Sequence, residues 1–189
     1  MKKRKKIIVD LVSGPGTGKS LYSTYLFTML KINGVNAEFV QEYAKDLVWR
    51  NKKELLRNQH IISYHQYKML KGASKYVDLV ITDGSLFHSY YYNRYSKINY
   101  SNVELTEKRI DKFINRFNHI VIFLERNPKY PYQKEGRYQT EEEAIAIDNK
   151  MKDILIEKNI PFISIMADMD NTDDMLAYIL SEVDRLGAL

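Results

Sequence analysis

The chain has 189 residues, of which 44% are hydrophobic and 28% are charged, a balance typical of a globular protein long enough to bury a core. No apolar run reaches the roughly 18 residues that a membrane span requires, and the lack of cysteine excludes disulfides, zinc–thiolate sites and a thiol nucleophile. We therefore expect a cytoplasmic protein with no membrane partner.

The net charge of +5 comes from the start of the chain. Residues 2–6 are all basic, and without these five the remaining 24 basic residues equal the 24 acidic ones. This lead-in, residues 1–6, is expected either to be a solvated approach to the first strand or to contact polyphosphate or nucleic acid. The rest of the chain has no average basic surface, so nucleic acid is not the favoured partner.

Short apolar runs alternate with amphipathic segments along the chain, which predicts an α/β fold with helices on both faces of a parallel sheet. The expected strands cover residues 6–12, 37–41, 77–82, 119–124 and 161–166. The expected helices cover residues 18–32, 43–75 with a break near Lys52, 101–117, 140–158 and 172–186. With no internal repeat or low-complexity linker, we expect one domain over residues 1–189.

Between the first strand and the first helix lies Ser-Gly-Pro-Gly-Thr-Gly-Lys-Ser, residues 13–20, which matches the Walker A phosphate-binding loop. Glycines let backbone amides converge on phosphate oxygens, and the helix N-terminus adds partial positive charge. Lys19 is expected to reach the β- and γ-phosphates, and the Ser20 hydroxyl to ligate Mg²⁺. The residues expected to bind ATP are Gly14, Pro15, Gly16, Thr17, Gly18, Lys19, Ser20 and Leu21.

The loop departs from the pattern at its first position, where Ser13 replaces glycine and must tolerate a tight turn. The alternative interpretation is a glycine-rich turn between strand and helix that binds no ligand.

Asp83 follows the apolar strand 77–82, which is the arrangement of a Walker B acid. The carboxyl ends of parallel strands form the ligand-binding edge of an open sheet, so Asp83 is expected to hold Mg²⁺ directly or through water. Alternatively, Asp83 caps the turn at Gly84. Asp78 lies early in the same strand, at the opposite edge of the sheet.

Glu42 follows the second strand at the same edge, close to where an acceptor hydroxyl would approach the γ-phosphate. A carboxylate there would accept the hydroxyl proton or orient the acceptor. The alternative role is stabilisation of the next helix through its dipole. Further along that helix, Trp49 is expected in the core, with the wall of an aromatic acceptor site as the second interpretation.

A polar, turn-rich segment with two prolines and a glycine, residues 126–140, follows the fourth strand and is expected to form a lid. Its closure over the phosphates would exclude water and neutralise charge in the transition state. Arg126 and Arg137 are the stronger candidates, ahead of Lys129 and Lys134, because a planar guanidinium suits phosphate oxygens. The alternative is an ordinary solvated loop.

Two further groups of residues have less specific patterns. The clustered tyrosines are expected either to stack on bases or to pack against helices. They are Tyr90, Tyr91, Tyr92, Tyr95 and Tyr100. The histidines lack metal-ligand spacing and are expected to be structural or on the surface; they are His60, His65, His88 and His119.

The sequence resembles P-loop nucleoside and nucleotide kinases in four segments. These are SGPGTGKS at 13–20, VQEYAKDLVW at 40–49, VITDG at 80–84 and the arginine-containing lid. More narrowly, they resemble the NadR-type AAA domain family, which includes ribosylnicotinamide kinase domains and bacteriophage members. The resemblance implies a three-layer sandwich with a five-stranded parallel sheet in order 2-3-1-4-5. It implies ATP- and Mg²⁺-dependent transfer of the γ-phosphate to a hydroxyl of a nucleoside, nucleotide or modified base. It also implies a catalytic carboxylate at Glu42.

Two other functions compete with the kinase: an AAA-like ring ATPase that remodels a partner, and a nucleotide-gated switch. About 23 residues follow Met166, which argues against the C-terminal helical domain of a ring ATPase. A DNA-directed kinase would require the basic lead-in and the tyrosine cluster to form one groove, with binding that weakens steeply with salt. A homodimer is compatible with any of these functions. The chain has no Asn-Lys-x-Asp guanine motif, which favours ATP.

Overall fold

The computed structural model describes residues 5–133 and 139–187. Residues 1–4 of the basic lead-in and residues 134–138 of the expected lid lie outside the described residues, so the predictions for Lys134 and Arg137 fall there.

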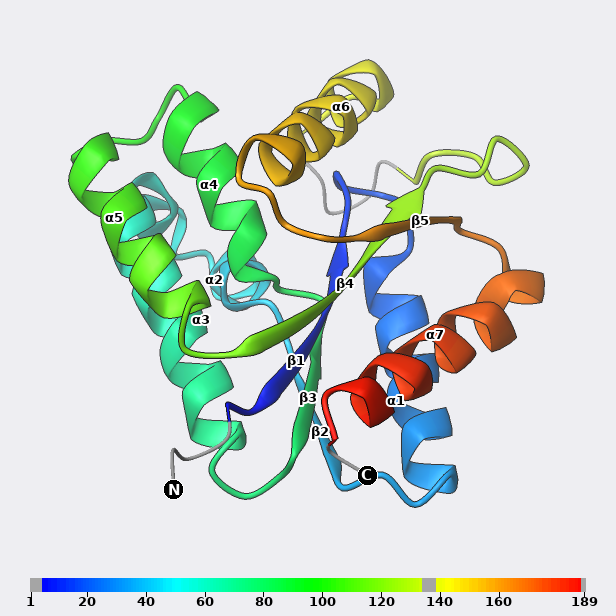
Figure 1. Cartoon of the computed structure of the whole chain (residues 1–189). Helices are drawn as coiled ribbons and strands as arrows, with labels where there is room; N and C mark the ends of the chain where they lie inside the picture. Colours follow the sequence, from blue (N-terminus) through cyan, green and yellow to red (C-terminus); the bar gives the residue numbers. More distant parts are fainter. Residues whose placement is uncertain (1–4, 134–138, 188–189) are drawn as a thin grey trace.

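Five parallel strands form one sheet in the order β2-β3-β1-β4-β5, which confirms the predicted topology (Figure 1). The strands are β1 (Ile7–Val12), β2 (Ala37–Val40), β3 (Leu79–Thr82), β4 (Asn118–Glu125) and β5 (Ile163–Met166). In the central strand, Ile7 pairs with Leu79 on one side and Asn118 on the other. Every residue of β1 is buried because helices cover both faces of the sheet.

Helices cover the two faces of this sheet (Figure 1). They are α1 (Lys19–Ile32), α2 (Tyr43–Trp49), α3 (Gln59–Ala73), α4 (Leu86–Tyr95), α5 (Val103–Ile114), α6 (Glu141–Glu157) and α7 (Thr172–Arg185), with short 3₁₀ turns η1 (Lys53–Arg57) and η2 (Met169–Asn171). One core lies between the sheet and α1 and α7, and a second lies between the sheet and α3, α4, α5 and α6. Together these layers make the predicted three-layer α/β sandwich.

Two details differ from the sequence-based expectations. Helix α4 was not predicted, because its aromatic-rich sequence lacks a clear apolar period and strong helix formers. Its N-cap Ser85 accepts a hydrogen bond from the amide of Phe87, and the helix buries Tyr90 in the core. The prediction of a core tryptophan was wrong: Trp49, at the end of α2, is 76% exposed. The predicted break near Lys52 is confirmed, and it separates α2 from η1 and α3.

A buried polar pair crosses the second core. Asp10 of β1 is fully buried, and its Oδ2 lies 2.6 Å from Nδ1 of His119 on β4. The other ring nitrogen of His119 lies 3.0 Å from the carbonyl of Ile114. Asp10 Oδ1 has no hydrogen-bond partner among the described residues. His119 is therefore the group that compensates the buried carboxyl of Asp10.

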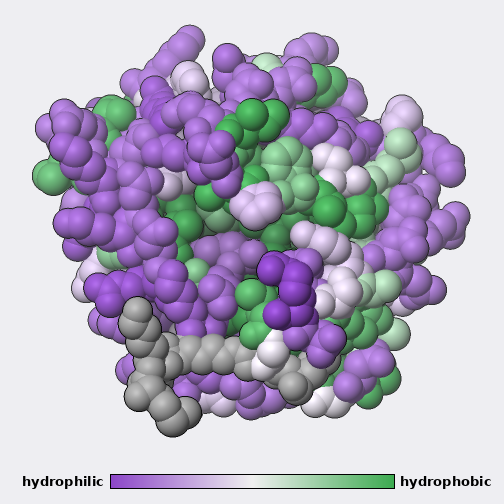
Figure 2. Space-filling view, viewed as in Figure 1, coloured by the Kyte–Doolittle hydropathy of each residue, from purple (hydrophilic) through white to green (hydrophobic). Residues whose placement is uncertain are grey.

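The surface seen in the direction of Figure 1 is mostly hydrophilic, with apolar residues gathered near the centre of the face (Figure 2). Strand β5 is an edge of the sheet, and its residues alternate between half-buried and exposed. Among residues 5–133 and 139–187, no helix combines the length and hydrophobicity needed to cross a membrane.

Candidate active site

The Walker A loop joins the buried end of β1 to the first turn of α1. Gly16 has φ +85°, and a Cβ there would lie 2.5 Å from the Tyr132 ring, so only glycine fits. Ser13 does not have a positive φ, so its replacement of glycine causes no backbone strain. Its hydroxyl is buried and hydrogen-bonds with that of Thr17. The sequence departure at Ser13 is thus accommodated inside the loop.

Lys19 lies over the loop that precedes it. Its ammonium group donates hydrogen bonds to the carbonyls of Ser13 (2.9 Å) and Gly14 (2.7 Å). Burial lowers the pKa of Lys19, and the nearby Glu42 carboxylate is the strongest influence in the opposite direction. Leu21, predicted to bind nucleotide, lies on the first turn of α1 with its side chain 56% exposed. The loop therefore holds the Lys19 ammonium group close to its own carbonyls, and the nucleotide-binding role of Leu21 stays a prediction.

The two residues predicted to hold a metal ion are in contact. The Ser20 hydroxyl donates to Asp83 Oδ2 at 2.5 Å, and the amide of Glu42 donates to Asp83 Oδ1 at 2.9 Å. Asp83 is buried and both of its oxygens are engaged in this way, so it does not cap the turn at Gly84. Lys45 of α2 donates to the Ser20 hydroxyl at 3.1 Å, a neighbour that the sequence analysis did not identify.

Glu42 is the N-cap residue of α2, but its side chain makes no capping hydrogen bond. Instead it lines a small pocket of about 110 Å³; the lining residues are Ser13, Pro15, Lys19, Glu42, His88 and Tyr92. Burial is the main cause that raises the pKa of Glu42, while Lys19 acts against it. Gly84, just after β3, packs closely against Glu42, because a Cβ there would lie 2.5 Å from the Cα of Glu42.

His88 and Tyr92 of α4 complete the wall of this pocket, and neither was a predicted site residue. His88 Nε2 lies 3.4 Å from the amide and 3.1 Å from the carbonyl of Ser13. Burial lowers the pKa of His88 to about 3, so the ring is neutral at physiological pH. Burial also raises the pKa of the Tyr92 hydroxyl, and Glu42 adds to the effect. Both were missed because α4 itself was not predicted.

Arg126 follows β4 and lies at the Walker A loop, as predicted. It donates to the carbonyl of Pro15 (2.9 Å) and to Asp148 of α6 (3.0 Å), and it lies under the Tyr132 ring. Asp148 also accepts a 2.5 Å hydrogen bond from the amide of Gly14. This carboxylate therefore connects the loop with the arginine, and it was missed because α6 carries no motif.

Lys129 is the other described cation of the expected lid, and it contacts the segment after β5, whereas Arg126 contacts the Walker A loop. It pairs with Asp168, after β5, at 3.4 Å, and its side chain is largely exposed. Asn127 also donates to Asp168, at 2.9 Å. The role of Lys129 in a lid over the phosphates stays a prediction.

A model of an AAA domain family matches residues 9–171 of the chain. No curated protein matches it in sequence. Among solved structures, a NadR protein in complex with NR superposes with a TM-score of 0.64 at 14% identity, covering 92% of this chain and 51% of that one. A NadR protein in complex with NAD and AMP-PNP has a TM-score of 0.69 at 13% identity, covering 94% and 49%.

The thymidylate kinase of Candida albicans has a TM-score of 0.55 at 14% identity, covering 96% of this chain and 92% of that one. The chain spans about half of the length of the two NadR chains. At these identities the likeness shows the fold, which is that of P-loop kinases.

Proposed function

The chain belongs to this AAA domain family of P-loop proteins, and on that premise we propose that it is an ATP- and Mg²⁺-dependent kinase. The proposed reaction transfers the γ-phosphate to a hydroxyl of a nucleoside, a nucleotide or a modified base. The ligands named for the neighbouring NadR structures, NR in one and NAD with AMP-PNP in the other, support an acceptor of the nucleoside type.

The observation that carries this proposal is the pocket shared by Lys19 and Glu42. A nucleotide-binding site alone needs a cation at the phosphates but no buried carboxylate beside it, because two negative groups repel each other. A kinase needs both, since a general base must lie close to the phosphate that the acceptor attacks. The raised pKa of Glu42 makes its carboxylate a better proton acceptor than an exposed one.

In the proposed phosphoryl transfer, each of four residues has a separate role. Lys19 exchanges its hydrogen bonds to the Ser13 and Gly14 carbonyls for phosphate oxygens. Glu42 orients the acceptor hydroxyl and takes its proton, and Arg126 donates to negative charge at the phosphates. His88 is a positioning residue, because its neutral ring holds the backbone of Ser13.

The oxygen atoms at the carboxyl edge of the sheet fit a magnesium ion. Ser20 offers a hydroxyl, and Asp83 a buried carboxylate in contact with it; such hard oxygen ligands are those that Mg²⁺ prefers. When bound, the ion would supply positive charge that neutralises the phosphates, with Ser20 and Asp83 as the residues that would hold it. Lys45 adds a second positive charge next to the Ser20 hydroxyl.

The proposal is tested by incubating the protein with γ-labelled ATP and Mg²⁺ and a panel of acceptors. The panel contains nucleosides, nucleotides, ribosylnicotinamide and DNA with hydroxylated bases, each compared with an acceptor-free reaction. Label appearing on one acceptor class is the expected result. Label released only as inorganic phosphate in every reaction would refute the kinase and favour an ATPase or a switch.

A further inference from the structure

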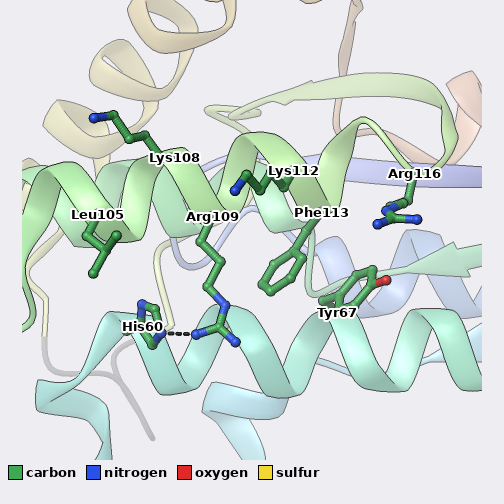
Figure 3. Close-up of a pocket in the computed structure, with 8 residues that line it drawn as sticks. All are labelled: His60, Tyr67, Leu105, Lys108, Arg109, Lys112, Phe113 and Arg116. Carbon is green, nitrogen blue, oxygen red and sulfur yellow. Dashed lines mark hydrogen bonds between the residues drawn. The ribbon is translucent and has the colours of Figure 1, made fainter.

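A second pocket lies between α3 and α5, and none of its lining residues belongs to the site described above. It has a volume of about 480 Å³ (Figure 3). Its lining consists of cations with an aromatic and apolar floor; the residues are His60, Tyr67, Leu105, Lys108, Arg109, Lys112, Phe113 and Arg116. We call this the α3–α5 groove.

The cations of the groove form a row. Lys108 and Lys112 are one helical turn apart, which corresponds to a rise of about 6 Å, and Arg116 follows just past the end of α5. Figure 3 shows the three side chains spread along α5 and not gathered at one point. A single phosphate ion is best held by groups that converge on it, whereas a row of cations matches a chain of charges.

These cations are largely uncompensated. Lys108 is paired with Glu104 at 2.6 Å, but no carboxylate of the described residues lies within ion-pair distance of Arg109, Lys112 or Arg116. Arg109 instead hydrogen-bonds with His60 of α3, and its guanidinium lies 4.9 Å from the centre of the Tyr64 ring. Its contacts are thus all with neutral or aromatic groups.

Apart from Glu104, which pairs with Lys108, the carboxylates of α5 are turned away from the groove and already have partners. Glu107 pairs with Arg94 (2.5 Å) and Lys158 (2.7 Å), and Asp111 accepts a hydrogen bond from Tyr90. Helix α5 therefore separates most of its charges: Glu107 and Asp111 pack against α4 and Lys158, and the cations of the groove are left to the solvent with Glu104 as their acidic neighbour. The body of the chain is neutral on average, yet this face is strongly positive.

The positive face continues toward the beginning of the chain. The amide of Asn118, two residues after Arg116, donates to the carbonyl of Lys6 at 2.9 Å, so the end of the groove lies beside residues 5 and 6. Lys6 is paired with Asp78, whereas Lys5 is exposed. The tyrosines of α4 do not line this groove: Tyr90 hydrogen-bonds with Asp111, Tyr92 lines the pocket of Lys19 and Glu42, and Tyr95 lies near Lys150 of α6.

We propose that the α3–α5 groove binds the phosphodiester backbone of a single nucleic-acid strand, separately from the Walker A site. A row of cations along one helix, over an apolar floor, is the footprint of backbone recognition without base readout. The buried rings of Tyr67 and Phe113, stacked 4.1 Å apart, support the helices and leave no face for a base. The bound strand is therefore recognised by charge and not by sequence.

The test measures fluorescence anisotropy of a labelled 20-mer of thymidine at 50 mM NaCl and then at increasing salt. For three or four cations, the logarithm of the affinity is expected to fall with the logarithm of salt with a slope of about −2 to −3. The groove variant Lys112→Glu/Arg116→Glu should lose at least about tenfold in affinity, with a slope shallower by about one unit or more.

The matched control is Lys52→Glu/Lys97→Glu, which makes the same change in net charge at two exposed lysines outside the groove. Circular dichroism and thermal melting establish that both variants are folded. Retained binding by the control, with loss in the groove variant, supports the proposal. Equal loss in both variants, absence of binding at 50 mM NaCl, or equal competition by polyglutamate of the same length would overturn it.

Discussion

Replacing Glu42 with Gln removes one negative charge from the pocket that it shares with Lys19 and leaves the shape of the side chain nearly unchanged. General base catalysis typically contributes 10²–10⁴-fold, so the variant is expected to lose transfer to the acceptor by roughly that factor. ATP affinity should change only a few-fold, because the loop carbonyls and amides that surround Lys19 are intact.

The same substitution should stabilise the fold near neutral pH. Burial raises the pKa of Glu42, so the folded protein binds this proton more tightly than the unfolded chain does. That contribution to stability is complete in acid, below the unfolded pKa of about 4.3, and is lost as the pH rises through the folded pKa. Above the folded pKa the buried, ionised carboxylate therefore destabilises the fold, and Gln removes that cost.

A stabilising substitution of this kind typically contributes about 0.5–2 kcal/mol, which for a chain of this length corresponds to a rise in thermal midpoint of roughly 1–8 °C. The assay combines label transfer, ATP binding by calorimetry, and melting between pH 8 and pH 4. The difference in midpoint should shrink as the pH falls. An equal loss of ATP binding and transfer would refute the role of base, and would make Glu42 part of the phosphate or metal site.

Three other substitutions test the remaining contacts. Lys19→Ala should bring ATP turnover below detection with an unchanged circular dichroism spectrum, and turnover at the parent level would exclude the Walker A role. Asp148→Asn removes the charge that holds Arg126, and with it a charged hydrogen bond that contributes about 1.5–3 kcal/mol. In initial-rate assays kcat/KM for ATP should therefore fall roughly 10- to 100-fold. An unchanged kcat/KM would mean that other contacts hold Arg126 in place. His119→Phe leaves the buried Asp10 without its hydrogen-bond partner and should lower the free energy of unfolding by about 1–3 kcal/mol. The double variant with Asp10→Val should recover most of that loss in urea titrations. Equal losses in both variants would contradict the pairing.

The architecture was predictable because it depends on local patterns. The apolar runs that became β1, β3 and β4 are bounded by glycine, aspartate or amphipathic segments, and parallel strands bring their carboxyl ends to one edge. That rule is sufficient to bring Ser20, Asp83 and Glu42 together, since each follows a strand or the loop after one. The contact between Ser20 and Asp83 follows from strand order alone.

The missing parts of the site come from helices whose side chains meet the loop only after packing. Asp148 lies in the middle of α6, far along the chain from the Gly14 amide that it contacts. His88 was predicted to be structural or on the surface, and its contact with Ser13 places it at the Walker A loop. Periodicity predicts which face of a helix is buried, but not which polar group on that face meets a distant loop.

Trp49, at the exposed end of α2, is an intrinsic fluorescence probe for this part of the protein. It is the one tryptophan among the 189 residues, and it ends the helix that Glu42 begins. Its indole is mostly in water, so its emission reports on the surroundings of this short helix without interference from another indole. Stopped-flow fluorescence at this residue would therefore follow the end of α2 during nucleotide binding, independently of phosphoryl transfer and without an added label.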